Sequence, residues 1–416
     1  MHTPCLHLRS EDSAKAKATV ERRHDEGMTK ALRLSAFASV CITCFFFIKY
    51  VRCTSLLPLA NLFGNKECRM SEKKRTFAAE MPFVENIRNY RSLSIVGLEK
   101  NTGKTVCLNY LLGRLDKLGI STAVTSIGVD GEQVDSVYAT AKPEVTLYEK
   151  MLFVTSEQHY FQRRLVSNIL SVGEQRTALG RLVTAQVLCT GKALLSGAAT
   201  TGLLRQQINQ FKKRDVQLTV VDGALSRLSL ASPTVTDAMI LATGAAVSPN
   251  IQQLISKTRF VYRLINLPEV SEELRAKLSM VTSGIWAVDS DNEIHDLGIA
   301  SVFLLGRKQQ DLFQYGTTLF ASGAVSDHLL KYLSAQSHIR ETVLIVRDFT
   351  KLFLTPEIYA EYTRRGGKLL VLQRSNVVAL CLNPTSPQGY TLNSAEACRQ
   401  LTDALGCPVY DVMNYM

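Results

Sequence analysis

The chain has 416 residues and a net charge of +11, and 46% of its residues are apolar while 20% are charged. That length allows two ordinary domains or three small ones, and the composition excludes a disordered or fibrous protein. The positive charge is concentrated in residues 1–90, where 15 Lys and Arg stand against 9 Asp and Glu. Because no basic stripe with interleaved aromatic residues follows, we do not expect a nucleic-acid partner.

The first 90 residues differ in composition from the rest of the chain. They contain five of the ten cysteines and an almost continuous apolar run over residues 34–48. This run is shorter than the roughly 18–20 residues that a membrane-spanning helix needs, and no small-residue cleavage site follows it as in a signal peptide. A short membrane anchor stays an alternative, but Met70 begins a segment that reads like an ordinary soluble N-terminus. We interpret residues 1–90 as an N-terminal extension, either disordered or wrongly assigned to the protein.

The other five cysteines are scattered through the body without metal-ligand spacing. Scattered single cysteines indicate a reducing compartment, so we expect a cytoplasmic protein.

Residues 91–119 predict a strand, a loop and a helix. The short apolar run 91–96 indicates a buried strand, and leucines recur at helical spacing from Val106 to Gly119. Between them, residues 97–105 read Gly-Leu-Glu-Lys-Asn-Thr-Gly-Lys-Thr. This context is typical of a phosphate-binding loop, because backbone N–H groups and the helix N-terminus surround the phosphate oxygens.

The loop assigns roles to its residues. Lys104 is expected to reach the β and γ phosphate oxygens, and the Thr105 hydroxyl is expected to ligate Mg²⁺. We therefore predict that the protein binds a nucleoside triphosphate with Mg²⁺. The expected nucleotide-binding residues are Gly97, Glu99, Lys100, Asn101, Thr102, Gly103, Lys104 and Thr105.

The spacing of the loop departs from the usual form, because five residues rather than four separate Gly97 from Gly103. The longer loop resembles that of dethiobiotin synthetase, and its Lys-Asn-Thr-Gly-Lys-Thr core is similar to the loop of MobB-type molybdenum cofactor proteins. Both belong to the SIMIBI group of P-loop proteins. In that group a loop lysine can reach across a dimer. Lys100 lies one residue off that pattern, so a homodimer with Lys100 at the partner's site and a solvated loop lysine both stay open.

Two acidic residues that follow predicted strands could complete a Mg²⁺ site. Asp130 follows the predicted strand 121–128, and Glu132 is the alternative acid. Asp130 can also belong to an Asp-Gly turn that has only a structural role. Asp222 ends the apolar strand 216–221, the pattern of a Walker B acid at the carboxyl edge of a sheet. The predicted catalytic residues are Lys104, Asp130 and Asp222, and the predicted Mg²⁺ ligands are Thr105, Asp130 and Asp222.

Further elements favour a doubly wound, mainly parallel sheet over residues 91–284. Strands predicted at 237–244 and 259–266 alternate with helices. Residues 156–210 look helical, and the small-residue stretch 190–202 is either a switch or partner loop or a tightly packed helix cap. The absence of an Asn-Lys-x-Asp motif from the sequence favours ATP over GTP.

A second α/β pattern begins near residue 285, and we assign residues 285–416 to a C-terminal α/β domain. Thr355-Pro356 predicts the start of a helix. The polar turn 383–389 follows a buried strand, where open α/β sheets place ligands, although it can also be a purely structural turn. The strands predicted here are 318–323, 343–348, 368–372 and 377–382.

Residues 94–105 resemble the loop of a KamB-type reactivase subunit of lysine 5,6-aminomutase, a SIMIBI-like P-loop ATPase. Similar segments are 125–132, 222–224 and 383–387, and the similarity runs from about residue 91 to the C-terminus. The resemblance implies a role in lysine fermentation together with a MutS-like ATPase subunit. The two would use ATP and Mg²⁺ to reactivate an adenosylcobalamin-dependent aminomutase by promoting the exchange of damaged cobalamin.

Two other functions stay open. A biosynthetic ligase or kinase of the dethiobiotin synthetase or MobB type would need a substrate pocket with its own catalytic groups, and no such set is legible in the sequence. A nucleotide-binding scaffold would bind the triphosphate without hydrolysing it.

Overall fold

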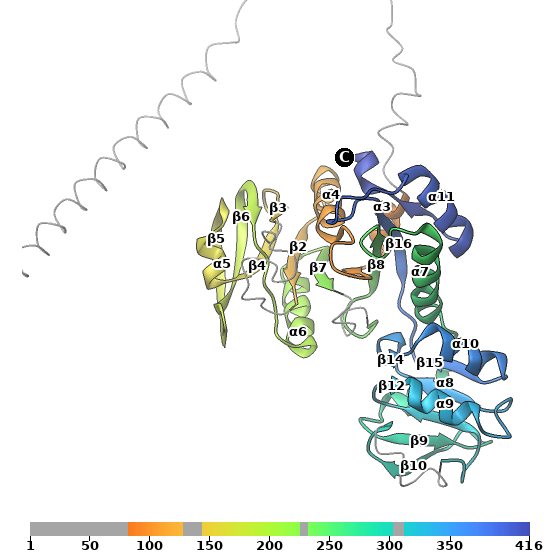
Figure 1. Cartoon of the computed structure of the whole chain (residues 1–416). Helices are drawn as coiled ribbons and strands as arrows, with labels where there is room; N and C mark the ends of the chain where they lie inside the picture. Colours follow the sequence, from red (N-terminus) through yellow and green to blue (C-terminus); the bar gives the residue numbers. More distant parts are fainter. Residues whose placement is uncertain (1–81, 128–143, 225–231, 303–311) are drawn as a thin grey trace, which may run out of the picture. The chain divides into compact units, whose positions relative to one another are not determined.

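The computed structural model describes residues 82–127, 144–224, 232–302 and 312–416 (Figure 1). They belong to one compact unit that runs from Ala78 to Met416. The chain is an α/β protein with a large mixed sheet and a smaller second sheet. The apolar run 34–48 lies outside the described residues. Within the described ranges, no helix is both long and apolar enough to cross a membrane.

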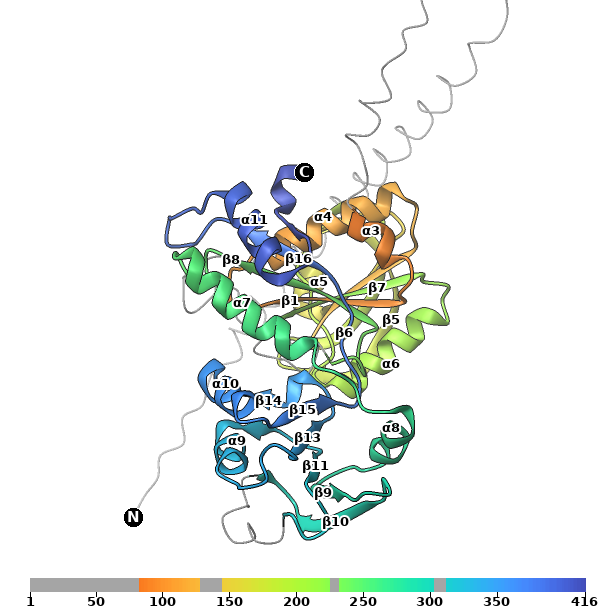
Figure 2. The ribbon, with the colours of Figure 1, turned by 90° about the vertical axis from the view of Figure 1, so that its right-hand side faces the viewer.

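Most of the large sheet is parallel, and β1 lies between β8 and β7 (Figure 2). Four of its strands pair in antiparallel fashion at one end, which makes the sheet mixed rather than purely parallel. In spatial order, the parallel strands are β17 (Val409–Tyr410), β16 (Val377–Asn383), β8 (Ala238–Gly244), β1 (Ser92–Gly97), β7 (Leu218–Ala224), β2 (Thr122–Ser126) and β4 (Leu152–Ser156). The antiparallel end adds β6 (Gly180–Ala193), which pairs with β4, β3 (Val145–Leu147) and β5 (Arg164–Thr177).

The central strands are buried over their whole length, as expected for parallel strands covered on both faces. Alternate β1 residues enter different hydrophobic clusters, because successive side chains of a strand point to opposite faces. Ile95 packs in the cluster that contains Leu108 of α4, and Val96 packs in the cluster that contains Leu254 of α7. The helices of this part are α3 (Pro82–Ile87), α4 (Lys104–Lys117), α5 (Glu157–Phe161), α6 (Thr201–Lys212), α7 (Ile251–Ile265), α11 (Ser394–Leu405) and the 3-10 turn η5 (Val412–Tyr415).

Helix α3 belongs to the core, although the sequence placed residues 82–90 in the N-terminal extension. Phe83, Val84 and Ile87 are buried in the same cluster as α4. The compact unit therefore begins before the boundary at residue 91 that composition suggested.

The prediction of helix over residues 156–210 was wrong for most of that range, because β5 and β6 form a long hairpin there. Val183, Ala185 and Val187 are buried while their neighbours are not, which is the period of two of a strand. Gly180 follows the turn with a φ of 89°, a conformation that glycine adopts without strain.

The strand predicted over residues 259–266 is also wrong, because this segment is the second half of α7. The Asn250 side chain caps the helix by accepting hydrogen bonds from the backbone N–H groups of Gln252 and Gln253. Leu254, Thr258 and Ile265 are buried at spacings of four and seven residues, so the apolar pattern has helical rather than strand spacing.

The chain leaves the large sheet after α7, forms the smaller sheet, and then returns. The order of the smaller sheet is β10 (Ile294–Ile299), β9 (Ile285–Val288), β11 (Thr318–Ala321), β13 (Val343–Val346) and β15 (Lys368–Val371), and β12 (Val325–Ser326) pairs with β14 (Leu352–Phe353). Its helices are α8 (Glu272–Ser279), α9 (Asp327–Ser334), α10 (Pro356–Arg364) and the 3-10 turn η4 (Phe349–Lys351). The predicted start of α10 is confirmed, with Pro356 in its first turn.

The return of the chain changes the domain assignment of its last 40 residues. Strand β16 pairs in parallel with β8 (Figure 1). Strand β17 pairs in parallel with β16. Residues 285–416 are therefore not one contiguous C-terminal domain, because β16, α11 and β17 complete the large sheet. The prediction of a strand from the apolar run 377–382 is confirmed. Which strand it pairs with could not be predicted from that run alone.

Candidate phosphate-binding site

The predicted order of strand, loop and helix around residues 97–105 is confirmed. Strand β1 ends at Gly97, and α4 begins at Lys104. A Cβ atom on Gly97 would lie 2.3 Å from Thr102 Oγ1 and 2.9 Å from Lys104 Cγ, so only glycine lets the loop fold back over the strand end. Asn101 and Gly103 have left-handed φ values of 62° and 87°, which close the turn.

Hydrogen bonds within the loop converge on one carbonyl group. Thr102 Oγ1 donates to the Glu99 carbonyl oxygen at 3.0 Å, and Lys104 Nζ donates to the same oxygen at 3.4 Å. The Leu98 N–H donates to the carbonyl of Ala242 in β8 at 2.9 Å, which ties the loop to the sheet. The Lys104 side chain therefore folds back onto the predicted phosphate-binding loop.

The N-terminus of α4 is open to a cavity. Its N-cap residue, Gly103, makes no side-chain capping bond, and the first turn carries no acidic residue. The backbone N–H groups and the positive end of the helix dipole at this position favour an anion. The adjoining cavity has a volume of about 440 Å³ and is lined by Lys100, Asn101, Gly103, Lys104, Thr105, Val106, Asn383, Thr385, Ser386 and Pro387.

The polar turn at residues 383–387 lies against the loop, although the sequence assigned it to another domain. Asn383 Nδ2 donates to the Asn101 carbonyl at 3.1 Å, and its Oδ1 accepts from the Thr385 N–H at 3.2 Å. A Cβ on Gly103 would lie 2.7 Å from Asn383 Cβ, so the approach is close. The pairing of β16 with β8 creates this proximity, because it brings the end of β16 to the edge where β1 ends.

Lys104 and Asp222 interact electrostatically. Burial lowers the pKa of Lys104, the nearby Asp222 carboxylate acts to raise it, and the Lys100 ammonium adds to the lowering. Asp222 lies on β7 opposite Ile95 of β1, and its backbone carbonyl accepts a hydrogen bond from Ser126 Oγ at 3.3 Å. The lysine and one of the two predicted acids are therefore close enough to interact electrostatically.

Other predicted residues have different outcomes. Thr105 lies in the first turn of α4 and lines the cavity. Asp130 and its alternate Glu132 lie outside the described residues. Across the described ranges, no group of three or more His, Cys, Asp and Glu residues is placed to hold a metal ion.

Glu99 and Lys100 are exposed on the loop. The Glu99 carboxylate lies 3.5 Å from Lys257 Nζ, and the same ammonium donates to the Val247 carbonyl at 3.1 Å. Sequence reasoning missed Lys257, because it read residues 259–266 as a strand and gave α7 no role at the loop.

The small-residue stretch 190–202 is closely packed. A Cβ on Gly197 would lie 1.5 Å from the Ser126 carbonyl oxygen. The next residue, Ala198, forms an isolated parallel β-bridge with Ile127. Thr200 Oγ1 caps α6 by accepting the Leu203 N–H at 3.3 Å. These contacts agree with the tightly packed helix cap, one of the two alternatives for residues 190–202. The other alternative, a switch or partner loop, stays a prediction.

Comparisons of the chain with protein-family models, with curated proteins and with solved structures give no match. The assignment of this site therefore rests on its geometry and on the loop sequence.

Proposed function

We propose that this chain is a P-loop ATPase that binds ATP with Mg²⁺ at residues 97–105, within a doubly wound nucleotide-binding domain. The observation that carries the proposal is the closure of the loop over Gly97, which places Lys104 at the open N-terminus of α4, where it interacts electrostatically with Asp222. A lysine and a hydroxyl at a helix N-terminus, with a carboxylate close enough to interact with the lysine, suit a magnesium-bound triphosphate.

The residues around the cavity fit such a ligand. A bound phosphate would give the buried Lys104 ammonium an anionic partner, which offsets the desolvation that lowers its pKa. Thr105 would hold Mg²⁺ through its hydroxyl, and Asp222 would hold it through its carboxylate. When bound, Mg²⁺ neutralises charge on the phosphate oxygens.

We further propose that this ATPase acts on another protein, as the resemblance of residues 94–105 and 383–387 implies. With a MutS-like ATPase, it would reactivate an adenosylcobalamin-dependent lysine 5,6-aminomutase by exchange of damaged cobalamin. The hydrogen bond from Asn383 to Asn101 supports this proposal, because it connects the loop to the turn at residues 383–387. A rearrangement of the loop on hydrolysis would therefore move the turn.

Reactivation tests this second proposal. A 5,6-aminomutase is first inactivated by turnover, and then this protein, the MutS-like partner, ATP, Mg²⁺ and adenosylcobalamin are added. We expect aminomutase activity to return with ATP and not without it. No recovery with all components present would contradict the reactivase role.

ATP turnover separates the reactivase from the ligase or kinase. A reactivase hydrolyses ATP slowly alone and faster with its protein partners. Negligible turnover until a small carboxylate or amine is added would instead favour the biosynthetic enzyme.

A further inference from the structure

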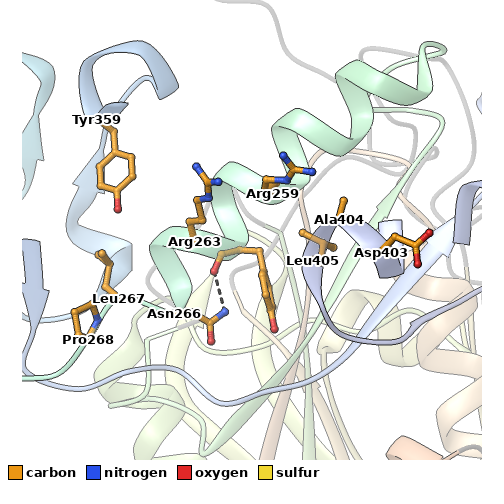
Figure 3. Close-up of a pocket in the computed structure, with 10 residues that line it drawn as sticks. Arg259, Arg263, Asn266, Leu267, Pro268, Tyr359, Asp403, Ala404 and Leu405 are labelled. Carbon is orange, nitrogen blue, oxygen red and sulfur yellow. Dashed lines mark hydrogen bonds between the residues drawn. The ribbon is translucent and has the colours of Figure 1, made fainter. Parts of the chain in front are cut away.

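Helices α7, α10 and α11 enclose a second region of cavities, which the phosphate loop does not line (Figure 3). Two cavities of about 590 and 580 Å³ share Arg259, Arg263 and Tyr359, so they adjoin. The first cavity is lined by Arg259, Tyr262, Arg263, Asn266, Leu267, Pro268, Tyr359, Asp403, Ala404 and Leu405.

Unpaired arginines are the main feature of this region. Arg259 and Arg263 are four residues apart on α7, so both lie on one face of the helix, and Figure 3 shows both guanidinium groups on the same side. Arg364 of α10 adds a third guanidinium to the second cavity. None of the three forms an ion pair or a hydrogen bond with any residue in the described part of the chain.

Arg259 is the most constrained of the three. Its Nε is buried and has no hydrogen-bond partner among the described residues. A buried donor without a partner destabilises the folded state, more so when it is charged, and a ligand oxygen in the cavity would supply that partner. Two arginines elsewhere in the chain do have partners: Arg181 lies 2.7 Å from Glu157, and Arg399 lies 2.7 Å from Glu396.

The remaining walls supply aromatic faces and neutral donors. Phe260 and Tyr359 pack edge to face with their ring centroids 5.9 Å apart. Burial is the main cause that raises the pKa of Tyr262 to about 12, so its phenol stays protonated at neutral pH. The described lining of the two cavities includes one acidic residue, Asp403, whose carboxylate is 3.3 Å from Arg399.

We propose that the adjoining cavities bind a small organic phosphate at Arg259, Arg263 and Arg364. Planar guanidinium groups pair with phosphate oxygens through two parallel hydrogen bonds, and a phosphate carries more charge and more acceptor oxygens than a carboxylate. The aromatic walls would contact the organic part of the ligand. Each cavity has a volume within the range of small-molecule sites.

Pyrophosphate binding, measured by titration calorimetry on the full chain, tests this site. All proteins carry Lys104→Ala, so that the phosphate loop does not contribute. We expect Arg259→Ala/Arg263→Ala to weaken pyrophosphate binding at least tenfold. The matched control, Arg88→Ala/Arg181→Ala, removes the same charge from two surface ion pairs and should change the affinity less than twofold.

A second variant covers the case in which the alanine protein does not fold. Arg259→Lys/Arg263→Lys keeps the charge but loses the two-pronged geometry, so binding should again weaken, with an unchanged melting temperature.

Three results would overturn the proposal: no pyrophosphate binding, equal weakening by the control pair, or tighter binding of citrate or of an acidic peptide than of pyrophosphate. The first two exclude a built phosphate site, and the third assigns the arginines to a carboxylate ligand or a protein partner. None of them depends on whether the loop at residues 97–105 binds ATP.

Discussion

At residue scale, the geometry around Gly97 leaves no room for a side chain. In Gly97→Ala the new Cβ would overlap Thr102 Oγ1 and Lys104 Cγ, so the loop must open. We expect a loss of about 1–3 kcal/mol in the free energy of unfolding together with weaker ATP binding. Gly323→Ala is the control, because no atom lies within 4 Å of its added Cβ. Equal stability of the two variants in urea unfolding would exclude the tight closure described for this loop.

Asp222 makes a separate prediction about turnover. Asp222→Asn removes the carboxylate charge but keeps the shape, so ATP binding should persist while Mg²⁺-dependent hydrolysis falls about a hundredfold. Asp116→Asn, an exposed position on α4, controls for the loss of one charge. Steady-state ATPase assays at several Mg²⁺ concentrations measure the effect, and an unchanged rate in Asp222→Asn would remove its Walker B role.

At element scale, α4 and β16 meet through two buried thiols. Cys107 Sγ and Cys381 Sγ are 3.5 Å apart. The hydrogen bond with Cys107, together with burial, raises the pKa of Cys381 well above its usual value of 9.0. A thiol whose pKa is raised in the folded state keeps its proton where the unfolded chain has lost it, so its contribution to stability is lost as the pH rises above about 9.

The raised pKa of Cys381 predicts how the stability of the protein depends on pH. Between pH 7.5 and pH 10, Cys381→Ala should lose less stability than the wild-type protein, although its stability at pH 7.5 is lower because of the cavity left behind. Cys189→Ala, at an exposed site, should follow the wild-type pH dependence. Urea unfolding at the two pH values measures both, and parallel curves for wild type and Cys381→Ala would refute the prediction.

The same scale shows what the sequence could and could not predict. The loop and its flanking strand and helix were predictable, because glycine positions, a buried apolar run and helical leucine spacing all act locally. The hairpin β5–β6 and the helix α7 were misread, because short apolar runs fit both periods until their partners are known. Asn383 was noticed as part of a polar turn, but its contact with Asn101 depends on a strand pairing between distant segments.

At the scale of the whole molecule, the large sheet is completed only by the last 40 residues. A chain that ends at residue 376 would expose β8 and remove Leu380, Leu382 and Leu401 from the core. We expect this truncated chain to lack the cooperative thermal unfolding of the full chain. Circular dichroism measures the transition, and a truncated chain with an unchanged midpoint would show that β16 is dispensable.

The predicted α/β class is confirmed only in its coarse form, because the large sheet contains both parallel and antiparallel strands. The partner proteins, the homodimer and the cytoplasmic location stay predictions, because they depend on surfaces and contexts outside this chain. The organic phosphate site on α7 could not be predicted from sequence, because it depends on the packing of three helices that are distant in the chain.

ATP binding is the central claim, and titration calorimetry with Mg²⁺ and ATP tests it most directly. We predict that the full chain binds ATP and that Lys104→Ala lowers the affinity by about a hundredfold or more, since it removes a charge-assisted contact to the phosphates. Lys117→Ala, in the last turn of the same helix, should bind like the wild-type protein. Undiminished affinity in Lys104→Ala would contradict the account.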